Sequence, residues 1–143
     1  MALDAAASFA IERLSLPVTQ PVGAGMPAGG DFFCPGALLE VAVDPASPLG
    51  HGLPPRTPVW FESSPAFDAP EGMVVARYGA NPLLSGWLLG AAKLDRQAAL
   101  VNVTLGRGHV VLFGFRPQYR AQSWATYIPF LNALYLSAAT EGR

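Results

Sequence analysis

Residues 97–120 read QAALVNVTLGRGHVVLFGFRPQYR, and this stretch decides the fold. Apolar side chains, many of them branched, recur at every second position on both sides of a central break, a spacing typical of β-strands. The break is Gly106-Arg107-Gly108, and glycine readily adopts the positive φ that a tight hairpin turn needs. Pro117 ends the second strand because proline has no N–H to donate to a neighbour. The stretch predicts a β-hairpin with a structured exit, and it holds no catalytic constellation.

The composition points to a chain that relies on a neighbour. The chain has 143 residues, enough for one domain with its own core. Hydrophobic residues make up 51% of it and charged residues 13%, about half of the roughly 25% usual in soluble domains. Either a shell of Gly, Pro, Ser and Thr covers the surface, or the chain is a piece of a larger protein with an apolar face that a neighbour covers. We favour the second interpretation because monomers rarely expose large apolar areas.

Charge and hydropathy exclude several classes of protein. The net charge of −1 gives no electrostatic footprint for nucleic acid or for an anionic membrane. The apolar runs are interrupted well short of the roughly 20 residues of a transmembrane helix, and no basic segment precedes the first apolar stretch as in a signal peptide. Cys34 is the single cysteine, so no internal disulfide forms. The cysteine count therefore does not indicate the cellular compartment.

The remaining elements follow from periodicity and from Gly/Pro punctuation. Asp4 is expected to be the N-cap of the first helix. Pro129 lies in the first turn of the last helix if that helix starts near Thr126, and it causes a kink if the helix starts at Ser123. The predicted elements are a helix over 5–14, a loop over 18–30, strands over 37–43, 58–62 and 72–78, a loop over 63–71, a short helical turn over 83–88 closed by Gly90, and a helix over 123–139 with an apolar stripe.

This order of elements predicts the fold class. A helix, a run of strands and a final helix do not show the alternating rhythm of a complete doubly wound domain. We therefore expect an α/β fold of α+β-like character, with a mixed, largely antiparallel sheet of about five or six strands and an N-terminal and a C-terminal helix.

No residue set predicts catalysis or metal binding. Cys34 stands in FFCPG, where Pro35 cannot supply the oxyanion N–H expected after a nucleophilic cysteine, so a structural thiol is favoured. His51 and His109 are the only histidines and lack the tight local spacing of zinc ligands. We expect no catalytic residue, metal or cofactor in this chain.

One polar cluster is a candidate binding site. Arg116 and Arg120, with Tyr119 between them, follow a strand and could grip a carboxylate or phosphate. Alternatively, the arginines pin the corner by bonding backbone carbonyls or an acid such as Asp44 or Glu62, and we favour this structural role. Core packing is likewise favoured over a sugar platform for the three tryptophans, Trp60, Trp87 and Trp124.

Five segments carry a resemblance to a known family. They read FFCPGALLEVAVD, PLGHGLP, VWFESSPAF, NPLLSGWLLG and GRGHVVLFGFRPQYRAQSWATYIPFLNALYL. The chain resembles the C-terminal class I glutamine-amidotransferase-like domain of bacterial zinc carboxypeptidases of the carboxypeptidase A type, from about residue 3 to residue 136. The blocks 81–90 and 106–120 are the most specific.

The resemblance implies a role for the whole chain. Residues 1–143 would form a single accessory domain, a C-terminal fragment of a larger protein, in which residues 3–6 end a strand of a flavodoxin-like sheet. The zinc ligands would lie in the preceding catalytic domain, which hydrolyses C-terminal peptide bonds, so this chain alone would not be an enzyme. The implied partner is that peptidase domain, and the parent protein would be secreted or periplasmic.

Two alternatives to this role remain. One is a module that binds a small molecule or a saccharide through Arg116, Arg120 and the tryptophans. The other is an oligomerisation domain that forms a homo-oligomer, similar to the amidotransferase-like trimerisation domain of some bacterial β-galactosidases.

Overall fold

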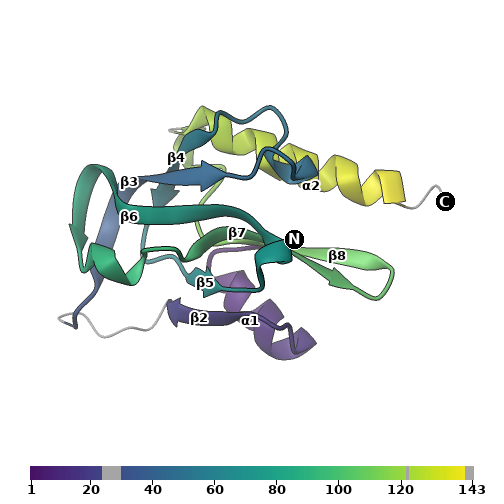
Figure 1. Cartoon of the computed structure of the whole chain (residues 1–143), viewed down its shortest axis with the longest axis horizontal. Coiled ribbons are helices and arrows are strands. Elements are labelled where there is room, and N and C mark those ends of the chain that lie inside the picture. The colour runs from purple at the N-terminus through teal and green to yellow at the C-terminus, as the bar shows by residue number, and fades with distance from the viewer. Residues whose placement is uncertain (24–29, 122, 141–143) are drawn as a thin grey trace.

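The protein is an α/β fold with a curled, mixed sheet and two α-helices (Figure 1). The computed structural model describes residues 1–23, 30–121 and 123–140. The helices are α1 (Ala5–Leu14) and α2 (Tyr127–Thr140), and short 3₁₀ turns include η1 (Pro48–Gly50) and η5 (Trp124–Thr126). The strands are β1 (Ala2–Leu3), β2 (Thr19–Val22), β3 (Phe33–Val43), β4 (Arg56–Phe61), β5 (Ala66–Asp68), β6 (Val74–Leu89), β7 (Ala98–Leu105) and β8 (Gly108–Phe113).

The hairpin predicted from residues 97–120 is confirmed as β7 and β8. The two strands pair antiparallel from Leu100↔Phe113 to Leu105↔Gly108, which leaves a two-residue turn. Gly106 is the first turn residue and has a φ of 59°, a conformation that glycine adopts without steric cost. The hairpin is therefore closed by the glycine that the sequence pattern pointed to.

The sheet is antiparallel except at one edge. Its main strand order is β1-β8-β7-β6-β3-β4, with β5 beside β7 and β2 beside β5. The parallel pair joins β1 to β8 through Ala2↔Leu112 and Leu3↔Phe113. The prediction of a mixed, largely antiparallel sheet is confirmed, but the sheet has eight strands rather than five or six.

The half of the hairpin farthest from its turn is buried, and a helix lies on each side of it (Figure 1). On the α1 side, Val101 and Val103 pack in a cluster with Ala7 of α1. On the α2 side, Phe113 packs in the larger cluster that includes Ala133 of α2. Burial on both faces fits the continuous apolar run over residues 98–101 of β7, whereas polar side chains alternate again at Asn102 and Thr104, nearer the turn.

Helix α2 begins at Tyr127, so Pro129 lies in its first turn, where the missing N–H costs little. Asn132 holds the helix in place by donating from Nδ2 to the backbone oxygens of Leu49 (3.1 Å) and His51 (2.9 Å). The inward residues include Ala133, which is 7% exposed. Much of the apolar stripe seen in the sequence faces outward instead, with these residues exposed: Trp124, Leu131, Leu134 and Tyr135.

The predicted helical turn over residues 83–88 is wrong. These residues belong to β6, which pairs with β3 through Leu83↔Leu39 and Trp87↔Gly36. Asn81-Pro82 as a helix start and Gly90 as a helix end suggested a helical turn, but the partner strand lies far away in the sequence and its hydrogen bonds override these local signals. Gly90 does not close a helix; it has a φ of 76° at the start of the next 3₁₀ turn.

Two strands lie where loops were predicted. Within the predicted loop 18–30, β2 pairs with β5, and Val22, the last residue of β2, is buried. Residues 24–29 of that loop lie outside the described residues. The predicted loop 63–71 contains β5, which joins β2 to β7. Both strands are only three or four residues long, too short for a periodicity signal.

Candidate functional site

The predicted polar cluster exists, and Arg116 lies at its centre between two carboxylates. Its Nε donates to Asp4 Oδ2 at 2.8 Å, and its Nη1 lies 3.1 Å from Glu62 Oε2. Its backbone N–H donates to the carbonyl of Trp60 at 3.0 Å. The residue therefore ties the end of β8 to β4 and to the loop before α1. We call Arg116, Asp4 and Glu62 the Arg116 triad.

The triad explains an unexpected role for Asp4. The sequence predicts an N-cap, and Asp4 does precede α1, but its side chain makes no capping hydrogen bond. Its backbone N–H donates to Phe113 O at 3.0 Å, and its carboxylate turns to Arg116 instead. Asp4 has φ 52° and ψ −124°, which is not the extended backbone of a capping residue, and its carboxylate forms a charge-assisted hydrogen bond with the guanidinium instead.

The charge of Arg116 is satisfied inside the protein. Burial by itself lowers the pKa of Arg116, but the hydrogen bond and charge of Asp4, together with the charge of Glu62, outweigh that effect and raise the pKa above its ordinary value. Of the two acids proposed from the sequence, Glu62 is a partner, whereas Asp44 accepts a hydrogen bond from the backbone of Ala46. The contacts of Arg116 thus fit the structural role, in which it joins the chain after β8 to β4 and to the segment before α1.

Tyr119 and Arg120 lie beside the triad on a sharp corner. The Tyr119 ring stacks on Trp60 with centroids 4.9 Å apart and an interplanar angle of 3°. The guanidinium of Arg120 lies 5.4 Å from the Tyr119 centroid, and that of Arg116 lies 5.6 Å from it. Because Trp60 covers one face of the Tyr119 ring, that face is not open to a sugar or another flat ligand.

The three tryptophans are not gathered in one platform. Trp60 is on β4 with its Nε1–H donating to Glu62 at 3.0 Å. Trp87 lies on β6 against Phe33, and Trp124 is in η5 with 80% of its surface exposed. Core packing, expected for all three, therefore fails for Trp87 and Trp124, which are exposed apolar surface.

Cys34 has the environment of a structural thiol. It is 3% exposed and packs in the larger core cluster. Burial raises the pKa of Cys34 to about 11, against a small opposing effect from the backbone of Gly36. At neutral pH the side chain is a protonated thiol, which is a poor nucleophile and a poor metal ligand. Within the described residues, no group of three His, Cys, Asp or Glu side chains is placed to hold a metal ion.

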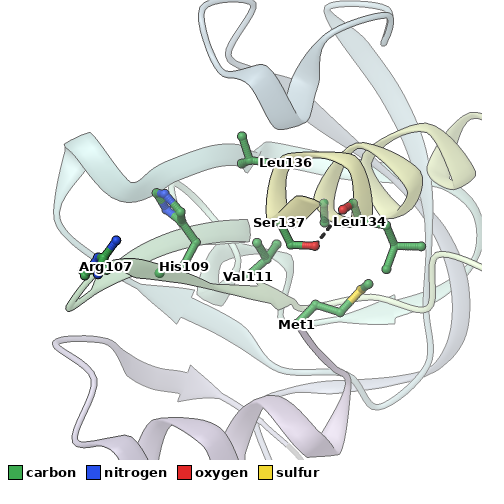
Figure 2. Close-up of a pocket in the computed structure, with 9 residues that line it drawn as sticks. Met1, Arg107, His109, Val111, Leu134, Leu136 and Ser137 are labelled. Atoms are coloured by element: carbon green, nitrogen blue, oxygen red, sulfur yellow. Dashed lines mark hydrogen bonds between the residues drawn. The ribbon is translucent and has the colours of Figure 1, made fainter. Parts of the chain in front are cut away.

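A second candidate site is a groove of about 670 Å³ between β8 and α2 (Figure 2). Polar and apolar surface line it about equally, with Arg107 and His109 at the end nearest the hairpin turn. It is lined by Met1, Arg107, Gly108, His109, Val111, Ala133, Leu134, Leu136 and Ser137. The parallel pairing of β1 reaches only Leu112 and Phe113, so within the described residues positions 108–111 of β8 have no neighbour strand on that side.

Sequence reasoning did not find this groove. Its walls come from the hairpin turn, from Met1 and from α2, which lie far apart in the sequence. The outward stripe of α2 continues from the groove, because Leu134 belongs to both. The signal in the sequence was the apolar stripe of the C-terminal helix. This stripe contains more apolar residues than one short helix can bury against a sheet.

Neither the family models nor the curated proteins contain a match to this chain. None of the described helices combines the length and the apolar character that crossing a bilayer requires.

Proposed function

We propose that this chain is a non-catalytic interaction domain that packs against a catalytic partner domain in a larger protein. The observation that supports this proposal is the outward apolar face of α2. Trp124 is 80% exposed, Tyr135 is 71% exposed and Leu134 is 45% exposed. Leu134 and Tyr135 lie on α2 and Trp124 lies in the η5 turn before it, and exposed aromatic and leucine side chains of this kind are typical of a surface that another protein covers.

The sequence resemblance identifies the candidate partner. It makes the parent a bacterial zinc carboxypeptidase-like hydrolase and the partner its catalytic peptidase domain, with zinc bound there. The flavodoxin-like, amidotransferase-like classification of this chain is part of the same proposal. The α2 face and the groove beside it would then dock on the peptidase domain and shape access to its active site.

The ligand-binding alternative has less support in the geometry. A site for an anion needs an arginine whose charge is available, whereas Arg116 already meets two carboxylates. A site for a sugar needs an open aromatic face, and Trp60 covers one face of Tyr119. Arg120 remains the exposed member of the predicted set.

The test starts from the residues encoded upstream of Met1. We expect them to include a peptidase domain with an HxxE motif and a later histidine. That domain, expressed separately, should bind this chain in a calorimetric titration, and Leu134→Lys should weaken binding at least tenfold because it places a charge in the docking face. Trp87→Lys, on a different surface, is the matched control and should bind like the unmodified chain.

A second readout concerns catalysis. Zinc and a peptide substrate added to this chain alone should give no release of the C-terminal residue, whereas the separate peptidase domain should release it. Hydrolysis by this chain, or binding that Leu134→Lys leaves intact, would overturn the proposal.

A further inference from the structure

We draw no further inference here: the strongest candidate, the groove between β8 and α2 with Arg107 and His109 at one end, belongs to the docking surface already proposed, and nothing among the described residues shows what else would cover it.

Discussion

Replacing Arg116 with methionine should destabilise the fold measurably. Methionine keeps much of the aliphatic volume but removes the charge, which leaves Asp4 and Glu62 facing each other without a cation. The exposed fractions of the three side chains are 34% for Arg116, 22% for Asp4 and 29% for Glu62. The triad thus lies between the exposed pairs worth about 0.2–1 kcal/mol and the buried pairs whose disruption costs about 3–5 kcal/mol.

We therefore expect a loss of about 2 kcal/mol in the free energy of unfolding. For a chain of this size, the entropy of unfolding converts that loss into a melting temperature lower by about 6 °C. The assay is thermal and urea unfolding followed by circular dichroism. Arg120→Met is the matched control, because Arg120 contributes a cation–π contact on an exposed corner and should cost less than about 1 kcal/mol.

The reasoning is refuted if Arg116→Met unfolds at the same urea concentration as the unmodified chain, or if Arg120→Met costs more. A stable Arg116→Met protein would mean that the carboxylates are solvated well enough without the arginine. The site would then need another explanation, and a ligand-binding role for Arg116 would become the better one.

Four further outcomes are expected. Cys34 should react with iodoacetamide at pH 8 far more slowly than the same chain in urea, since its pKa of about 11 keeps the thiol protonated. Because that pKa lies above the ordinary 9.0, the stability that Cys34 contributes is complete below pH 9.0 and is lost as the pH rises to about 11, so Cys34→Ala should flatten the stability profile in that window. Gly114→Ala should cost about 1–3 kcal/mol in urea unfolding, because its Cβ would clash with Pro65 O, whereas Gly79→Ala, with no atom within 4 Å, should be nearly neutral. Tyr78→Phe should cost about 1 kcal/mol by removing the hydrogen bond from the buried hydroxyl to the Gly114 carbonyl (3.2 Å), measured in the same unfolding assay.

The hairpin was predictable because its information is local. The glycine at the turn, the alternation and the stop at Pro117 all lie within one stretch of the chain. Helix α1 was predictable for the same reason, and its predicted bounds match the observed Ala5–Leu14. The strand conformation of residues 83–89 in β6 was not predictable. These residues become a strand only by pairing with β3, which lies more than forty residues earlier in the sequence.

The candidate site was predictable in part. Glu62 was a reasonable partner for Arg116, because an acid at the end of one strand often meets an arginine at the end of another. Asp4 was not a reasonable partner, since a residue directly before a helix is expected to cap it. Only the parallel pairing of β1 with β8 brings Asp4 to Arg116, and a two-residue strand leaves no pattern in a sequence.

The same pairing sets the order in which the molecule can be built. Asp4 and Arg116 are separated by 112 residues, and the sheet edge beside them joins the first residues of the chain to its last hairpin. At a synthesis rate of about 5–20 residues per second, the amino-terminal segment waits on the order of ten seconds for its partner strand to leave the ribosome. During that wait, the sheet edge cannot close, and residues 83–89 of β6 are synthesised before the partner strand of β1 is complete. Refolding from urea should accordingly be slow, in the millisecond-to-second range of non-local β topologies, and its yield should fall as protein concentration rises.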